Sequence, residues 1–227
     1  MKLIVHRVGG DVNVSRHEIF TNLVSSEEEL REMLGSPGKL AAHKTIRFLD
    51  EHCRNFIAKS PFLVIATADA GGSCDASPRG DAPGFVHVVD EKHLVIPERQ
   101  GNRKFDSLLN ILANPNVGLF FMIPGLGETL RINGRGYVIK DNGMLEGMTV
   151  QGKTPLVGIG IEVEECYIHC AKAIKRSELW QPSTWLTQMQ LPSIPHMLAA
   201  HIQIPDEVIT PEDVEKSLEE SYTKRLY

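Results

Sequence analysis

The spacing of hydrophobic positions changes several times along the chain, and each change predicts a different element. Ser25 begins a Ser-Ser-Glu-Glu-Glu run that offers an N-cap and an acidic first turn, so a short helix is expected over residues 25–34. From Lys39 to Ile57 apolar residues recur at helical spacing, and Pro61 closes the segment. This pattern predicts a second, longer helix before the first strand.

Beyond Pro61 the pattern changes to short β-rich runs joined by polar turns, which is typical of antiparallel strands. Strands are predicted over residues 62–68, 73–76, 85–89, 93–96, 117–122, 129–139 and 158–167. A helix interrupts them over residues 103–113, and its apolar face is formed by Phe105, Leu108, Leu109 and Leu112. A shorter helix is expected near residues 144–151. Strands in this order favour a barrel, because closure removes exposed edges.

After Cys170 the strand pattern stops, and helical or irregular stretches follow over residues 171–179, 183–201 and 210–227. A chain of 227 residues, of which 42% are hydrophobic, can bury a sizeable core. No internal repeat or Gly/Ser linker divides it. We therefore expect a single domain over residues 1–227, mainly β with flanking helices (the α+β class). Its N-terminal helices span about residues 25–58, and its C-terminal helical extension spans about residues 170–227.

Charge and composition remove several classes of function. A formal charge of -5 and a pI near 6.0 leave no basic excess for a phosphate backbone, so no nucleic-acid partner is expected. The N-terminal apolar run is too short for a secretory signal, and no apolar stretch is long enough to span a bilayer. The protein is therefore expected to be cytoplasmic and to have no membrane partner.

The cysteine pattern indicates free thiols. The four cysteines form no C-x-x-C pair, and in a reducing compartment disulfides are rare. Cys166, His169 and Cys170 lie close enough in sequence to raise zinc as an option, but no second cluster completes a four-ligand site. No metal is expected.

Cations gather where a predicted strand gives way to a predicted helix. Asn102, Arg103 and Lys104 stand at the expected helix start, where free N–H groups and the helix dipole favour an anion such as phosphate. The alternative is a solvated surface pair. Arg79, in a Ser-Pro-Arg-Gly-Asp run, adds a third cation, and its alternative is a surface loop in which it pairs with Asp81.

A later strand carries two polar residues on one face. Thr129 and Arg131 are separated by the strand period of two, so they could hydrogen-bond a ring system lying across the sheet, or they could face solvent. Neither a dinucleotide-binding nor a P-loop motif is present, and no serine lies in a Gly-x-Ser-x-Gly elbow. Nucleoside triphosphate chemistry and a nucleophilic triad are therefore disfavoured.

Taken in order, these features resemble the FMN-binding split barrels of the pyridoxamine-phosphate-oxidase superfamily. The resemblance is specific from about Ser73 to Tyr137, and it extends through the C-terminal tail to an uncharacterised FMN-dependent subgroup of that superfamily. The segments that carry it are SPRGD from Ser77, VIP from Val95, NRK from Asn102, NP at Asn114, TLRING from Thr129, CAKAIKRSELW from Cys170 and the closing KRLY.

The resemblance implies an FMN-binding split β-barrel and an FMN-dependent oxidoreductase. In such a protein Arg103 and Lys104 would hold the FMN phosphate. The arginine that opens the preceding strand segment would be Arg79, followed by Gly80. Backbone groups of Ile96 and Pro97 would face the polar edge of the isoalloxazine ring. Thr129 would take the place of a glutamine near that ring, with Arg131 after it.

The resemblance also bears on partners and reaction. Family members bury the flavin at a homodimer interface, which makes Lys172, Arg176 and Trp180 candidates to reach the flavin of a second subunit. The vitamin B6 oxidase has a C-terminal Arg-x-His signature that this chain lacks, so oxidation of pyridoxamine phosphate is not expected. The expected partner of the flavin is a small organic substrate or a reduced nicotinamide, and no catalytic residue is assigned. The alternatives are a non-catalytic flavin carrier or sensor, and a heme- or deazaflavin-using member of the same fold.

Overall fold

The computed structural model describes residues 20–227, so the N-terminal stretch from which the lack of a secretory signal was expected lies outside it. The chain divides after His43 into two compact units. Each unit is described by itself, and a single domain over the whole chain stays a prediction. No helix within residues 20–227 is long and apolar enough to cross a membrane.

The first unit contains two short helices, α1 (Glu27–Leu34) and α2 (Lys39–Ala42). The hydroxyl of Ser26 caps α1 by accepting a hydrogen bond from the amide of Glu29 at 3.2 Å. Three glutamates follow in the first turn, where the helix dipole favours negative charge. The predicted first helix is therefore confirmed.

The second unit begins at Lys44 and holds all seven strands. Its elements, in chain order, are α3 (Glu51–Lys59), β1 (Phe62–Ala68), β2 (Cys74–Gly80), β3 (His87–Val88), β4 (His93–Pro97), α4 (Asp106–Ala113), β5 (Asn116–Met122), β6 (Thr129–Ile139), α5 (Asn142–Glu146), β7 (Gly158–His169), α6 (Lys172–Arg176), η1 (Pro182–Thr184), η2 (Gln188–Gln190), α7 (Ile194–His201) and α8 (Pro211–Lys224).

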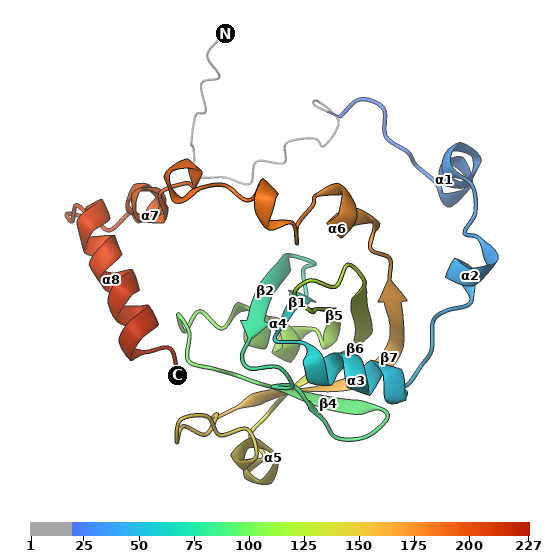
Figure 1. Ribbon diagram of the computed structural model, residues 1–227, viewed down its shortest axis with the longest axis horizontal. Coiled ribbons are helices and arrows are strands. Elements are labelled where there is room, and N and C mark those ends of the chain that lie inside the picture. The colour runs from blue at the N-terminus through green and yellow to red at the C-terminus, as the bar shows by residue number, and fades with distance from the viewer. Residues whose placement is uncertain (1–19) are drawn as a thin grey trace. The chain divides into compact units, whose positions relative to one another are not determined.

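The strands form one antiparallel sheet in the order β2-β1-β5-β6-β7-β4-β3 (Figure 1). A register shift between Asn133 and Gly134 marks a bulge in β7, where Glu164 has no partner on β6. A Cβ at Gly134 would lie 2.0 Å from the carbonyl oxygen of Glu162, so only glycine fits this close approach. The mainly β prediction with flanking helices is confirmed. The returning strand of the first hairpin, expected to begin over residues 73–76, continues through Arg79 and Gly80.

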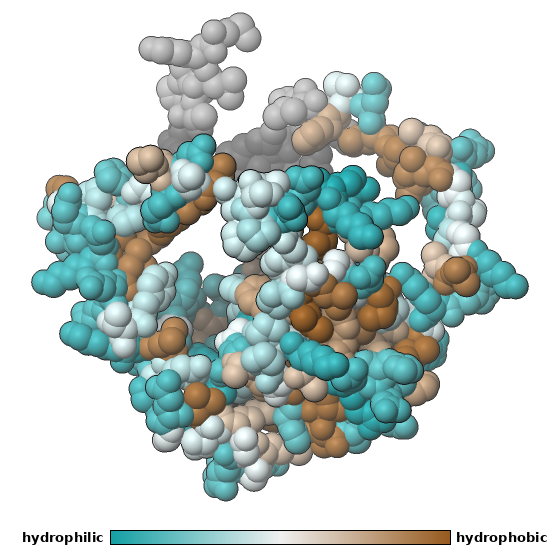
Figure 2. Space-filling view, viewed as in Figure 1, coloured by the Kyte–Doolittle hydropathy of each residue, from teal (hydrophilic) through white to brown (hydrophobic). Residues whose placement is uncertain are grey.

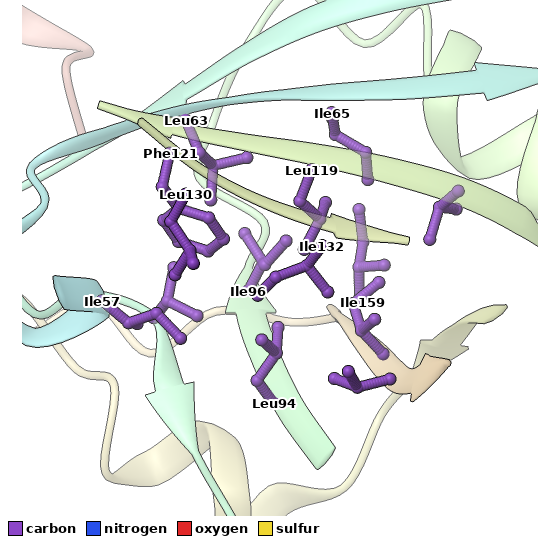
Figure 3. Packing of buried hydrophobic residues seen from close by; sticks show 14 of the residues in the cluster. Ile57, Leu63, Ile65, Leu94, Ile96, Leu119, Phe121, Leu130, Ile132 and Ile159 are labelled. Atoms are coloured by element: carbon purple, nitrogen blue, oxygen red, sulfur yellow. The ribbon is translucent and has the colours of Figure 1, made fainter. Parts of the chain in front are cut away.

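The core lies inside the curved sheet. Side chains from neighbouring strands point toward one another there, and Ile57 of α3 joins them from the side (Figure 3). β1 and β5 alternate between buried and less buried positions, as period-two strands with one covered face do. The members that are almost completely buried include Leu63, Ile65, Ile96, Leu119, Phe121, Leu130, Ile132 and Ile159.

The predicted long second helix is wrong, because two short helices occur instead. Between them Ile46 pairs with Cys166 of β7 through two backbone hydrogen bonds, of 2.9 and 2.8 Å. The carboxylate of Asp50 then accepts a hydrogen bond from the amide of Cys53 at 2.8 Å and starts α3. Strand-like pairing and a new N-cap therefore overrode a continuous helical pattern.

The predicted apolar face of α4 is also wrong in part. Leu108 and Ile111 are buried in the core, whereas Leu109 and Leu112 are 58% and 72% exposed. Phe105 is exposed too and precedes the helix, which begins at Asp106. Successive helix residues are about 100° apart, so packing on β1 and β6 selected one stripe and left a second apolar stripe outside.

The C-terminal extension is less helical than predicted. Its helices are short apart from α8, which a capping box between Thr210 and Asp213 begins. Many large apolar side chains from Leu179 to Val208 are exposed, among them Met189 at 95%. Figure 2 shows apolar surface in the region of α7 and α8. This part of the second unit therefore leaves much hydrophobic surface in contact with solvent.

Candidate functional site

A cavity of about 880 Å³ lies where β2 and β4 end and the loop toward α4 begins. This volume is in the usual range for small-molecule sites. Its wall combines β2, the start of α4, the loop before β7 and the last two residues of the chain. The polar and charged residues in the wall are Ser77, Arg79, Glu98, Arg99, Gln100, Asn102, Arg103, Asp106, Ser107, Lys153, Thr154 and Tyr227.

Arg79 reaches the cavity from β2 rather than from a surface loop. One of its Nη atoms lies 3.3 Å from the carboxylate of Glu98, and the other donates to the carbonyl of Pro78 at 2.9 Å. The pairing with Asp81 that the loop alternative implied is therefore wrong. The Nε of Arg79 is buried and has no hydrogen-bond partner within residues 20–227. A ligand oxygen could accept that bond.

Glu98 brings a buried carboxylate to the same wall. Burial raises the pKa of Glu98, and the nearby positive charge of Arg79 offsets only part of this effect. The side chains of the pair are 16% and 20% exposed. A carboxyl group with a raised pKa can hold a proton at a pH at which an exposed glutamate has lost it. Burial thus favours the protonated form of Glu98 more than it would that of an exposed glutamate.

Asp81 and Arg99 form a second ion pair beside the first. The Nε of Arg99 donates to Asp81 at 2.7 Å, and its Nη1 donates to the carbonyl of Met148 at 2.9 Å. The hydroxyl of Tyr227 also donates to Asp81, at 2.8 Å. Burial alone would raise the pKa of Asp81, but the hydrogen bonds from Ala82, Tyr227 and Arg99 and the charge of Arg99 lower it overall. Asp81 is therefore a stable anion.

The Arg103–Lys104 pair does not act as one unit. Arg103 lines the cavity, whereas Lys104 is exposed and is not part of the cavity wall. The backbone explains the separation, because Arg103 and Phe105 have φ angles of 60° and 61°, in the left-handed region. Such conformations cost about 1–3 kcal/mol each and gather at ligand sites. The loop is therefore held in a special shape beside the cavity.

The start of α4 borders the cavity through Asp106 and Ser107. Phe105 is the N-cap residue, and its side chain has no acceptor for the first amides of the helix. The hydroxyls of Ser77 and Ser107 both donate to the carboxylate of Asp75, at 2.8 and 3.0 Å. Because both hydroxyl protons are used in these hydrogen bonds, the two oxygens can only accept a hydrogen bond from a ligand. The wall therefore presents acceptors next to cations.

β4 meets the cavity at its end. Pro97 lines the cavity, whereas the side chain of Ile96 is fully buried in the core. β3 pairs with β4 only at Leu94 and Val95, so on that side Ile96 and Pro97 lie beyond the paired residues. The structure is thus consistent with a role for Ile96 through its backbone alone.

The remaining predicted residues lie away from the cavity. Thr129 is 2% exposed, and its hydroxyl has no partner in the described part of the chain. Arg131 is exposed and lies 5.8 Å from the centre of the Tyr167 ring. The indole of Trp180 donates to the carbonyl of Leu126 at 2.8 Å. Lys172 and Arg176 belong to α6 and do not line the cavity.

Among the cavity residues that sequence reasoning missed are Glu98, Arg99 and Tyr227. The pattern held a signal for the first two, because an acid and a base directly follow a strand whose end was assigned to the site. Tyr227 had no such signal, since its partner Asp81 is 146 positions away.

Two further features complete the neighbourhood. A second cavity of about 750 Å³ is lined by Asp81 and shares Phe85 and Arg99 with the first. Cys166, considered above as a zinc ligand, faces the core, where its sulfur lies 3.3 Å from that of Cys53. Neither thiol forms a disulfide. The hydrogen bond to Cys53, together with burial, raises the pKa of Cys166. No group of three or more metal-binding side chains occurs within residues 20–227.

Solved structures of other proteins are similar at low sequence identity. HupZ of Group A Streptococcus is 17% identical, with a TM-score of 0.43, and the match covers 52% of this chain and 92% of that chain. General Stress Protein 26 from Bacillus anthracis is 14% identical, with a TM-score of 0.39 and coverages of 52% and 93%. A conserved hypothetical protein from Mycobacterium tuberculosis is 10% identical, with a TM-score of 0.42 and coverages of 61% and 91%.

The sequence itself gives the stronger comparison. No curated protein matches the chain. The sequence model of one family, described as pyridoxamine 5'-phosphate oxidase, matches residues 49–170, which is more than half of the 227 residues. The match contains all seven strands and the loop that carries Arg103. With its antiparallel sheet and flanking helices in the split-barrel arrangement, the chain belongs to the pyridoxamine 5'-phosphate oxidase family.

Proposed function

We propose that this chain is a flavoprotein and that the 880 Å³ cavity holds FMN. The observation that carries the proposal is the buried Nε of Arg79, a donor without a partner among the described residues on a residue that lines the cavity. A buried donor left unpaired costs free energy, so a ligand oxygen that accepts from it is favoured. Membership of the family supports FMN as that ligand.

The phosphate end of FMN fits the side of the cavity near α4. Arg103 lies there, next to the uncapped first turn of the helix, and both features favour an anion. Arg79 and Lys153 add positive charge to the same wall. A cluster of this kind suits one phosphate, and the sequence has no dinucleotide-binding fingerprint. These residues would therefore select FMN over FAD.

The middle and the ring of FMN would meet neutral groups. Ser77 and Ser107 offer lone pairs that can accept from the ribityl hydroxyls. The backbone at Ile96 and Pro97 remains the candidate for the polar edge of the ring, and Thr129 and Arg131 remain more distant candidates. Lys172, Arg176 and Trp180 stay proposals for contact with the flavin of a second copy.

The proposed activity is that of an FMN-dependent oxidoreductase. Bound FMN supplies hydride exchange with a small organic substrate or a reduced nicotinamide. The chain binds and orients the cofactor, limits access of water, and can hold a proton on Glu98. The second candidate is a flavin carrier or sensor without turnover. It is favoured by one observation, namely that Glu98 in the cavity wall and the neighbouring Asp81 are both ion-paired.

Two measurements test the proposal. The purified protein is expected to show flavin absorption bands, and mass spectrometry of the compound released on denaturation is expected to identify FMN. A protein that neither retains nor takes up FMN would contradict the cofactor. The bound flavin is then mixed anaerobically with NADH, NADPH or pyridoxamine phosphate. Bleaching by a nicotinamide, with recovery in air, supports the oxidoreductase, whereas reduction by dithionite alone favours the carrier or sensor.

A further inference from the structure

The last residue described, Tyr227, is attached to the wall of the cavity by three contacts. Its hydroxyl donates to Asp81 at 2.8 Å, and its ring lies 5.9 Å from the guanidinium carbon of Arg99. The ammonium of Lys153 donates to its carbonyl oxygen. The three partners come from three separate parts of the chain. In Figure 1 the end of α8 leads back toward the β2 side of the sheet.

The groups that hold Tyr227 are themselves fixed. The side chain of Asp81 is 2% exposed, and it accepts from the backbone amide of Ala82 at 2.7 Å as well as from Arg99. Arg99 is fixed at its other end by the carbonyl of Met148. An anchor of this kind exists before Tyr227 arrives, so little ordering is needed when the hydroxyl bond forms. The contact is therefore more than a chance encounter of a surface tail.

The extension before Tyr227 has few attachments of its own. Within α8 only Val214 is buried, and the helix packs mainly on α7. Leu226 and Tyr227 are the residues of the extension that line the cavity. A segment with few buried contacts opens more readily than a core strand. This combination, a support with few buried contacts and a specific anchor at a ligand-sized cavity, is that of a latch.

We propose that Tyr227 is a positioning residue that latches the cavity, and that its hydroxyl must leave Asp81 before FMN can enter or leave. The proposal rests on the proposed function for the identity of the ligand. The latch works through Asp81 and Arg99, so breaking the hydroxyl bond raises the rates of FMN entry and release. A hydrogen bond to a charged acceptor corresponds to a change of about tenfold or more in rate.

The test measures how fast bound FMN exchanges with isotope-labelled FMN, followed by mass spectrometry of the full chain. Tyr227→Phe keeps the ring and its contact with Arg99 and loses only the hydroxyl, so an increase of about tenfold in exchange is expected. Tyr227→Ala also loses the ring, and a larger increase is expected. Tyr222→Ala is the matched control, because Tyr222 is 64% exposed on α8, and its exchange rate should equal that of the unaltered chain.

A readout that needs no flavin separates the latch from the cofactor assignment. Hydrogen–deuterium exchange of residues 222–227 in flavin-free protein should be faster in both Tyr227 variants and unchanged in the control. Equal exchange of FMN and of these amides in all four proteins would overturn the latch while FMN binding stands. If the unaltered chain binds no FMN, the proposed function fails, and the amide exchange alone decides: faster exchange in the variants supports the latch, and equal exchange overturns it.

Discussion

At the scale of single residues, the cavity is defined by two ion pairs and one unused donor. Arg79 with Glu98 and Arg99 with Asp81 place two cations in the wall, and each cation already has an anion beside it. The Nε of Arg79 is the donor that this arrangement leaves without a hydrogen-bond partner within the described residues, and Oε2 of Glu98 is an acceptor left in the same state. Arg103 is a third cation, and it forms no ion pair within residues 20–227. Affinity for an anion should therefore depend most on Arg103 and Arg79.

Substitution of Arg103 should weaken FMN binding more than substitution of its neighbour Lys104. Arg103→Ala is expected to weaken FMN binding about tenfold to a hundredfold, because a charge-assisted hydrogen bond contributes about 1.5–3 kcal/mol. Lys104→Ala is the matched control, because its side chain is not part of the wall, and a change below about threefold is expected for an exposed charge. Fluorescence titration with FMN gives both values. Equal losses in the two variants would mean that the pair acts together after all.

Glu98 should make the free energy of unfolding fall as pH rises. Its pKa is raised in the folded protein, so the folded state holds a proton that the unfolded state has released. The free energy of unfolding from this group is therefore highest below the ordinary carboxyl range and falls as pH rises through the raised pKa. Urea denaturation across this range should show a weaker fall in Glu98→Gln. The exposed Glu91→Gln should follow the unaltered protein, and an identical slope in Glu98→Gln would refute the assignment.

At the scale of elements, close backbone contacts decide the path of the strands. The bulge at Glu164 of β7, beside Gly134, lets β6 stay paired with β7 along eleven pairs of residues. It also brings Gly134 against the carbonyl of Glu162, where no side chain fits. The same sheet leaves Leu109 and Leu112 of α4 outside, because the helix packs through Leu108 and Ile111. The sequence of an element therefore determines which of its faces are apolar. Packing against the neighbouring element determines which of those faces is buried.

Because of this close backbone contact, adding one methyl group at Gly134 should strongly lower the stability of the protein. Gly134→Ala should lower the free energy of unfolding by about 3 kcal/mol, since the added methyl group overlaps a backbone atom that cannot move freely. Gly101→Ala is the control, because nothing lies within 4 Å of a Cβ there, and its stability should be nearly unchanged. Thermal and urea unfolding report both. A Gly134→Ala protein as stable as the control would show that the β6–β7 pairing can shift.

At the scale of the whole molecule, the C-terminal extension exposes several large apolar side chains to solvent. Trp185, Leu186, Met189 and Val208 are each more than half exposed. Contiguous apolar surface of this kind marks interaction sites. We propose a second copy of this chain as the partner that covers it, as the family resemblance implies. The flavin of a homodimer would then lie within reach of residues that one copy cannot bring to its own cavity.

Assembly is directly measurable. Light scattering of the full chain is expected to give about twice the mass of 25.2 kDa, because a cyclic dimer is the commonest way to cover such a surface. Met189→Lys, which places a charge on an exposed apolar position, should shift the protein toward the monomer. Thr223→Lys on α8 serves as a polar control. A monomer that keeps its FMN would argue against the interface.

Local patterns in the sequence determined much of the fold. Alternation and turn residues predicted the seven strands, and Ser26 and Thr210 are caps of the kind that single sequences reveal. These features depend on residues that are neighbours in sequence. Arg79, Gly80, Pro97 and Arg103 were placed in one site through the family resemblance, and all four line the same cavity.

Only the tertiary structure decided the rest. The break before Asp50 depends on pairing with Cys166, and the contact of Asp81 with Tyr227 joins positions 146 apart. Left-handed φ angles at Arg103 and Phe105 turned Arg103 toward the cavity and left Lys104 outside. In each case the deciding energy comes from packing or hydrogen bonds between distant segments. Periodicity and capping describe only the chain's immediate neighbourhood, so they could not select these contacts.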